Sequence, residues 1–244
     1  MRNIALVISY EGTAYHGWQC QPGLITIQQV LQEKIENIVN HKVKIYGGAR
    51  TDSGVHAFGQ TVNFFTESII DMRGLARGLN SQLPTDIRIR SAREVDGHFH
   101  SRYSAKSKIY VYSILNTPHN SPFYVRYTWH IPYLLDVSNM NKASKIVIGT
   151  HDFSAFKKKD EIYQSAVREL IKTGVKRRGD FIYVVVEAKG FLRYMVRNIV
   201  GTLMLVGKGK LTVDKFKGIL ESKDRVRAGP TAPAKGLFLR KIKY

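Results

Sequence analysis

One aspartate, in the stretch GGARTDSGVHAFGQ over residues 47–60, has the surroundings of a reactive group. Its four glycines favour a particular backbone shape over regular secondary structure. Asp52 follows Arg50 by two residues and lies between the hydroxyls of Thr51 and Ser53. A carboxylate held on a rigid loop can act as a nucleophile or a base. An isolated Asp in such a loop is more often a turn residue, so both interpretations stand at this point.

A carboxylate that stays ionised in a buried site needs a cation nearby, and the segment GFLRYMVRNIVGTLMLVGKG offers two arginines. Apolar residues recur there at helical spacing and predict a buried amphipathic helix of about four turns: Leu192, Met195, Val196, Ile199, Val200, Leu203 and Met204. Arg193 and Arg197 are four residues apart, which places them on one side of that helix. Arg197 can pair with Asp52, or it can simply extend along the edge of the core.

Aromatic and basic residues alternate in the segment that leads into the second half of the chain: Tyr103, Tyr110 and Tyr112 with Arg102, Lys106 and Lys108. This is the pattern expected where bases stack on rings and cations contact phosphates, although alternating tyrosines in a strand more often serve packing. His98 and His100 have strand spacing. No thiolate or carboxylate adjoins them, so we expect a solvated or RNA-facing pair rather than a metal site.

The net charge of +19, from 38 Lys and Arg against 19 Asp and Glu, favours a polyanionic partner such as nucleic acid or an anionic membrane surface. Residues 1–105 contribute 11 basic and 9 acidic side chains, whereas residues 106–244 contribute 27 and 10. The single cysteine, Cys20, excludes an intrachain disulfide and a zinc site built of several thiolates. Without a signal peptide or a long apolar run, the sequence predicts a cytoplasmic protein.

The composition becomes basic and rich in hydroxyl residues around 101–108, which predicts two domains, 1–105 and 106–244. In the first we expect strands at 3–9, 43–46, 61–65 and 87–95, a helix that Thr26 opens with Gln29 in a capping box, a helix before Pro84, and a loop over 47–59. In the second we expect a helix capped by Gly149, two strands around the Gly-Asp turn of 167–190, the Arg197 helix, a helix at 212–221 and a strand at 236–242.

Six segments, in order and across nearly the whole chain, closely resemble the tRNA pseudouridine synthase A family: YEGTAYHGWQ, GGARTDSGVHAFGQ, FHSRYSAKSKIYVYSI, GTHDFSAF, FLRYMVRNIVGTL and AGPTAPAKGLFL. Any one segment is a weak signal, but six in register are a strong one. Glu11 in place of the usual Asp and Ser53 in place of Ala are mild departures. The basic stretches at 157–159 and 176–178 are particular to this chain.

The resemblance implies an α+β fold of two similar subdomains. Their antiparallel or mixed sheets would join into one continuous sheet flanked by helices and loops, across a central basic cleft. It also implies a homodimer that isomerises uridine to pseudouridine at positions 38, 39 and 40 in the anticodon stem-loop of tRNA. No cofactor and no metal are implied.

Carried over residue by residue, the resemblance makes Asp52 the catalytic aspartate and Arg197 its paired arginine. Arg50 would help to open the RNA stack, and Tyr110 would lie against the target base. We expect the remaining RNA contacts to include Arg102, His100 and Arg193. The sequence leaves open whether Asp52 attacks uracil C6, attacks ribose C1′ or removes a C2′ proton, because each route needs the same carboxylate.

Two other functions fit parts of the pattern. A non-catalytic RNA-binding protein needs only the basic half and the interleaved tyrosines, with Asp52 as a turn residue. A metal-dependent nuclease would need several clustered carboxylates, and the sequence shows none close to Asp52.

Overall fold

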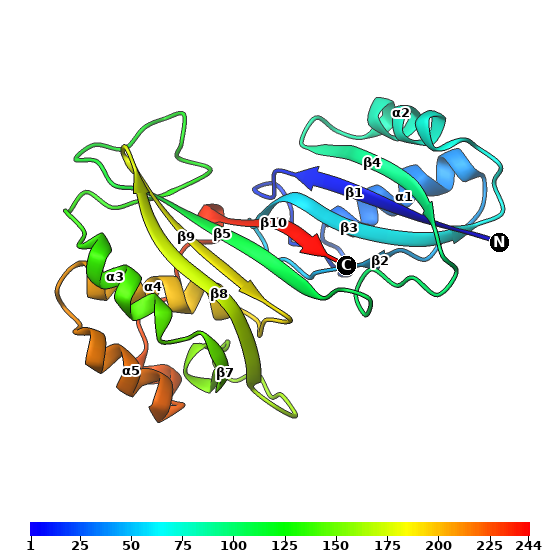
Figure 1. The fold of residues 1–244 in the computed structure, drawn as a ribbon. Helices are drawn as coiled ribbons and strands as arrows, with labels where there is room; N and C mark the ends of the chain where they lie inside the picture. The colour runs from blue at the N-terminus through cyan, green and yellow to red at the C-terminus, as the bar shows by residue number, and fades with distance from the viewer. The chain divides into compact units, whose positions relative to one another are not determined.

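The computed structural model describes all 244 residues, and the chain divides into two compact units. The first unit contains Met1–Lys106 together with Phe238–Tyr244, and the second contains Ser107–Leu237. Each unit combines a largely antiparallel sheet with α-helices (Figure 1), so the predicted α+β class is confirmed. None of the five α-helices is long and apolar enough to cross a membrane.

The sheet of the first unit has the strand order β4–β1–β3–β10, and β2 also pairs with β3. Its elements are β1 (Arg2–Tyr10), α1 (Ile27–Val39), β2 (Tyr46–Gly47), β3 (His56–Thr66), α2 (Met72–Gln82), β4 (Ile87–Val95) and β10 (Leu237–Lys243). Strand β1 is antiparallel to both β3 and β4, whereas β10 runs parallel to β3. The last strand of the chain therefore belongs to the same sheet as the first.

Helix α1 shows how local sequence sets this unit's elements. Thr26 is the N-cap, and its side chain accepts a hydrogen bond from the Gln29 N–H at 3.4 Å. The Gln29 side chain donates to Glu33 instead of returning to Thr26, so only half of the predicted capping box forms. The buried face of the helix consists of residues four apart, namely Ile27, Leu31, Ile35 and Val39.

The strand predicted over 43–46 is wrong, because only Tyr46 and Gly47 enter the sheet. Val43 and Ile45 are buried without ladder pairing, and their alternation therefore reflects burial rather than strand pairing. The predicted loop is also too long, since β3 begins at His56. β2 pairs with β3 at Val62 and Asn63 of β3, and β10 pairs with β3 at His56 and Ala57 of β3. The loop that contains Asp52 thus connects two paired strands.

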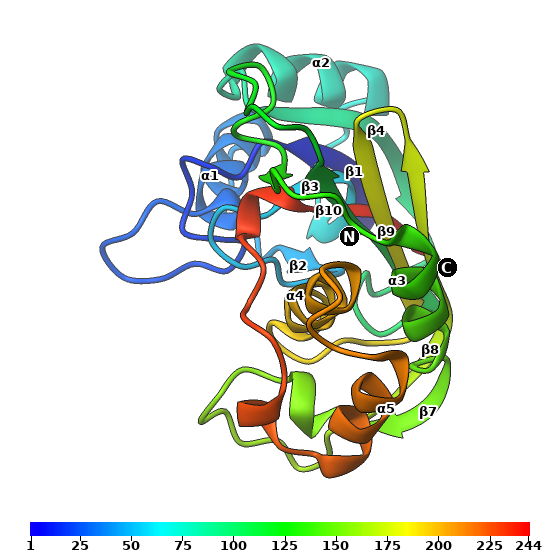
Figure 2. The same ribbon diagram turned by 90° about the vertical axis from the view of Figure 1, so that its left-hand side faces the viewer.

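The second unit has the strand order β5–β9–β8–β7, all antiparallel, and β6 pairs parallel to β5. Its strands are β5 (Ser107–Leu115), β6 (Trp129–His130), β7 (Gly149–Asp152), β8 (Val167–Arg178) and β9 (Phe181–Ala188). Its α-helices are α3 (Val137–Lys145), α4 (Met195–Gly207) and α5 (Val213–Ser222). Figure 2 shows α4 and α5 on the same side of β8 and β9. The Gly-Asp turn is confirmed between β8 and β9, with Gly179 at φ 55°.

Two helix boundaries differ from the prediction. Helix α3 ends at Lys145 with Ile146 as its C-cap, whereas Gly149, at φ 103°, begins β7. Helix α4 begins only at Met195, because Tyr194 has a left-handed conformation with φ 64°. Such a residue interrupts the helical ladder. Arg193 therefore precedes α4 and does not share a helical side with Arg197, although the predicted buried helix itself is confirmed.

Candidate active site

The loop Gly48–Val55, called the Asp52 loop below, joins β2 to β3 and places Asp52 at a tight turn. The Val55 N–H donates to the Asp52 carbonyl at 3.1 Å, and Gly54 adopts φ 75°. Asp52 is thus the first residue of a β-turn, a position that Asp favours. The turn uses the backbone carbonyl of Asp52, so it is compatible with a chemical role for the half-buried carboxylate.

The segment Tyr10–Trp18, called the brace segment below, fixes the Asp52 loop by hydrogen bonds on both sides of the aspartate. The Trp18 N–H donates to the Thr51 carbonyl at 3.0 Å. The Tyr15 carbonyl accepts the Ser53 hydroxyl at 3.1 Å and the Gly54 N–H at 3.4 Å. Because the residues on either side of Asp52 are tied to a second segment, the backbone at Asp52 has little freedom to move.

Two glycines allow this close approach of backbones. Gly17 has φ +86°, and a Cβ there would lie 2.7 Å from the Thr51 carbonyl oxygen. At Gly12 a Cβ would lie only 2.1 Å from the Val55 carbonyl oxygen. Each of these obstacles is backbone and cannot rotate away, so both positions require glycine.

Buried polar side chains support the Asp52 loop from behind. The Tyr10 hydroxyl lies 2.8 Å from Thr51 Oγ1, and burial raises the pKa of Tyr10, which keeps the phenol protonated. Gln60, with no exposed surface, accepts from the Ala49 N–H at 3.1 Å and donates to the Ala49 carbonyl at 2.6 Å. These bonds satisfy the backbone of Ala49 and the hydroxyl of Thr51 within the first unit.

The sequence pattern predicted no role for the brace segment. Its contacts with the Asp52 loop join residues about forty positions apart, so no local pattern reveals them. The only signal in the sequence is that YEGTAYHGWQ is one of the six segments that carry the family resemblance.

Arg50, at the start of the same loop, is exposed, and its side chain makes no hydrogen bond or ion pair. It is therefore available to an incoming ligand.

His100 and Arg102 lie in the turn that precedes the second unit. His100 Nδ1 accepts the backbone N–H groups of Arg102 at 3.1 Å and Tyr103 at 3.4 Å. Burial, followed by the charge of Arg102, lowers the pKa of His100, so the ring is neutral near pH 7. His98 is exposed, and neither histidine lies in a strand, so the predicted strand spacing of this pair is wrong.

Tyr103 presents an exposed ring next to a cation. Its side chain is 74% exposed, and the Arg102 guanidinium carbon lies 5.4 Å from the ring centroid. An exposed ring beside a guanidinium is suited to stacking on a base. Tyr112, by contrast, is fully buried and donates to the Pro233 carbonyl at 2.8 Å, so it serves packing.

In the second unit, Tyr110 lies on β5 and is buried, with its ring packed edge-to-face on Phe191 at 5.1 Å and 86°. Arg197 is half-buried in the first turn of α4. Its Nε donates to the Ala232 carbonyl at 2.8 Å, which fixes the guanidinium.

The structure brings Arg193 and Arg197 together through Tyr194 instead of along a helix. Their guanidinium carbons lie 5.4 Å and 4.7 Å from the Tyr194 ring centroid. The predicted site residues therefore form two sets: Arg50, Asp52, His100 and Arg102 in the first unit, and Tyr110, Arg193 and Arg197 in the second.

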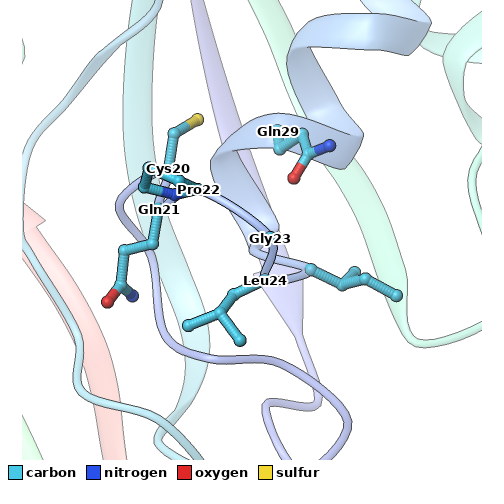
Figure 3. A pocket seen from close by; sticks show the side chains of 7 residues that line it. Cys20, Gln21, Pro22, Gly23, Leu24 and Gln29 are labelled. Carbon is cyan, nitrogen blue, oxygen red and sulfur yellow. The ribbon is translucent and has the colours of Figure 1, made fainter.

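Across the chain, no three His, Cys, Asp or Glu side chains lie close enough together to hold a metal ion. A cavity of about 490 Å³ lies at the loop before α1, between Cys20–Ile25 and Gln29 (Figure 3). Its lining contains neither a charged side chain nor any of the predicted site residues. This cavity therefore has none of the groups expected of the active site.

Comparison with known proteins gives consistent matches along the chain. A protein-family model described as tRNA pseudouridine synthase matches residues 6–104 and 143–244. These two ranges include every predicted site residue except Tyr110.

Curated relatives match over their full length. A protein of Thermoanaerobacter sp. (strain X514) named tRNA pseudouridine synthase A is 48% identical over 244 residues, with all of both chains covered. Proteins of the same name from Acetivibrio thermocellus and Clostridium kluyveri are each 43% identical, again over all of both chains.

Proposed function

The chain belongs to the tRNA pseudouridine synthase family, and on that premise we propose that it acts at positions 38, 39 and 40 of the anticodon stem-loop with Asp52 as the catalytic carboxylate. Synthases of this kind are isomerases. The reaction breaks the bond between ribose C1′ and uracil N1, turns the base and forms a bond between C1′ and C5. The C5 hydrogen leaves as a proton, and no net oxidation or reduction occurs.

The observation that carries the proposal is the hydrogen bonding that fixes the Asp52 loop. The brace segment bonds to the loop on both sides of Asp52, and Tyr10 and Gln60 satisfy its buried polar groups. A nucleophile or base must be held within a fraction of an ångström of its reacting atom, which such a loop allows. A residue that served only as a turn would not need this support.

Three routes use the same carboxylate. Asp52 can attack uracil C6, attack C1′ with the uracil as leaving group, or remove the C2′ proton to release the base. In each route the carboxylate must be ionised in a site from which most water is excluded. We propose that Arg197 pairs with Asp52 and keeps its carboxylate ionised. The bond from its Nε to the Ala232 carbonyl fixes the direction of the guanidinium.

Base flipping gives Arg50 and Tyr110 their proposed roles. The target uridine must leave its stack, which costs a few kcal/mol. The exposed Arg50 would fill the vacancy, and the ring of Tyr110 would lie against the flipped base. Arg50 and Tyr110 both lie within segments that carry the family resemblance, GGARTDSGVHAFGQ and FHSRYSAKSKIYVYSI.

Phosphate and base contacts would hold the rest of the tRNA. Arg102 with the exposed ring of Tyr103 would stack on a base, and Arg193 would contact the backbone. His100 is neutral and bonded to the Arg102 and Tyr103 N–H groups, so we give it the role of shaping that turn. The resemblance also leads us to expect a homodimer in the cytoplasm.

The test uses tRNA transcripts that carry [5-³H]uridine and have only one uridine among positions 38, 39 and 40, with a fourth transcript that has none. We expect tritium release from each of the first three and none from the fourth. Release from the fourth at an equal rate would overturn the assignment of positions. Retained tRNA binding with no release from any transcript would instead support the non-catalytic alternative.

A further inference from the structure

A second cavity, of about 470 Å³, lies in the second unit at the start of α4 and is called the cation cavity below. Its charged lining consists of Lys158, Lys159 and Arg225 with one carboxylate, that of Asp160. None of these three cations forms an ion pair with a carboxylate. The cavity therefore has an excess of positive charge that no side chain of the chain neutralises.

The cavity is built around a buried polar residue, Asn198, which has no exposed surface. Its Nδ2 donates to the Phe156 and Lys157 carbonyls at 2.8 and 3.0 Å, which anchors the stretch that carries Lys158. Its Oδ1 accepts from Arg225 at 3.0 Å and from the Thr231 hydroxyl at 2.7 Å. The Asn198 side chain therefore links the stretch that carries Lys158 to Arg225 and Thr231 on the other side of the cavity.

Arg225 is fixed but not neutralised. One of its terminal nitrogens donates to Asn198 and Thr231, and the other donates to the carbonyls of Ala228 and Gly229. Burial lowers the pKa of this guanidinium, because its charge is partly removed from water with only neutral acceptors around it. An anion in the cavity would offset that cost.

Tyr194 adds a further feature that favours an anion. It is the N-cap of α4, and no side chain caps the helix there, so the positive end of the helix dipole adds to the local potential. Lys158 Nζ lies 6.0 Å from the Tyr194 ring centroid, on which Arg197 also packs at 4.7 Å. Lys158 and Arg197 are therefore close enough to contact the same short stretch of a bound strand.

We propose that the cation cavity binds a backbone phosphate of the tRNA close to the nucleotide that reacts. This inference rests on the proposed function, which supplies the RNA. Lysine binds phosphate as a point charge, and the guanidinium of Arg225, whose terminal N–H groups already bond to neutral acceptors, adds its positive charge to the cavity. The basic stretch 157–159 would then strengthen RNA binding without taking part in the chemistry.

The test compares the double variant Lys158→Gln/Lys159→Gln with a matched control, Lys210→Gln/Lys215→Gln. The control removes two charges from exposed positions that follow the other end of α4. The affinity for full-length tRNA is measured between low and physiological salt. Loss of one phosphate contact makes the slope of log K against log salt shallower by about 1.

We expect the salt slope to become shallower by about 1 in the cavity variant and to stay unchanged in the control. Equal slopes in all three proteins, or an equal change in both variants, would overturn the proposal. Binding is measured without turnover, whereas tritium release by the unchanged protein tests the proposed function, so the two can fail separately.

A second arm distinguishes an RNA phosphate from inorganic phosphate. The thermal midpoint of the protein is measured in inorganic phosphate and in chloride at equal ionic strength. Saturable stabilisation by phosphate that disappears in the cavity variant, combined with an unchanged RNA slope, would assign the cavity to the free anion and overturn the RNA assignment.

Discussion

The Asp52 loop and the cation cavity are both polar sites, but the structure builds them in opposite ways. The Asp52 loop is fixed by backbone hydrogen bonds and by glycines that permit contact between two backbones. The cation cavity is fixed by one buried side chain, Asn198, and its lining carries three cations against one carboxylate. A reacting carboxylate needs position, whereas a phosphate contact needs charge. The first region should therefore be sensitive to shape and the second to charge.

If the Asp52 loop is the region sensitive to shape, the largest loss of stability should come from Gly17→Ala. A methyl group there overlaps the Thr51 carbonyl and must adopt φ +86°, so we expect a loss of about 3 kcal/mol in unfolding free energy. Gly23→Ala is the control, because φ is +72° but no atom lies within 4 Å, so only conformational strain of about 1 kcal/mol is expected. Urea unfolding of both variants gives the difference. Equal losses would mean that the contact with the Asp52 loop is unimportant.

Tyr10→Phe should have a smaller effect on the same region. It removes the hydroxyl next to Thr51 at 2.8 Å and should lower kcat about fivefold with KM unchanged, equivalent to about 1 kcal/mol. Tyr133→Phe, at an exposed ring with no hydrogen bond from its hydroxyl, is the control. Steady-state kinetics on tRNA separates kcat from KM. A change confined to KM would place Tyr10 in RNA binding instead of loop support.

The cation cavity should tolerate a change of shape that keeps the charge. Lys158→Arg/Lys159→Arg should retain tRNA affinity within about twofold and the same salt slope, since each phosphate contact depends on charge. A filter-binding titration against salt measures both. A loss as large as that of the Gln variants would show that this region is as sensitive to shape as the Asp52 loop.

The smallest expected effect is on the pH dependence of stability and concerns Tyr244, which lies in the first unit. Its hydroxyl donates to the Ser101 carbonyl at 2.7 Å, and burial raises its pKa to about 12. The neutral phenol is favoured by folding, so its contribution is fully present below pH 10 and is lost as the pH rises toward 12. Unfolding free energies of the protein and of Tyr244→Phe should converge over that window. Parallel pH profiles of the two proteins would contradict the claim that the neutral phenol of Tyr244 stabilises the fold.

The sequence correctly predicted the features that depend only on neighbouring residues. The strand predicted over 3–9, the N-cap Thr26 and the Gly-Asp turn at Gly179 all appear as expected. The brace segment was not predictable, because its bonds to the Asp52 loop link distant parts of the chain. The left-handed Tyr194 was not predictable either, since apolar spacing continues through it and a non-glycine residue seldom adopts that conformation.

The central claim is that the Asp52 carboxylate performs the isomerisation. It is tested most directly by single-turnover tritium release from tRNA made with [5-³H]uridine, in buffer with EDTA, by the protein and by Asp52→Asn. We predict release by the protein, a loss of at least about 10³-fold in the variant, and tRNA affinity that stays within a few-fold. Release by Asp52→Asn at the rate of the unchanged protein would contradict the account.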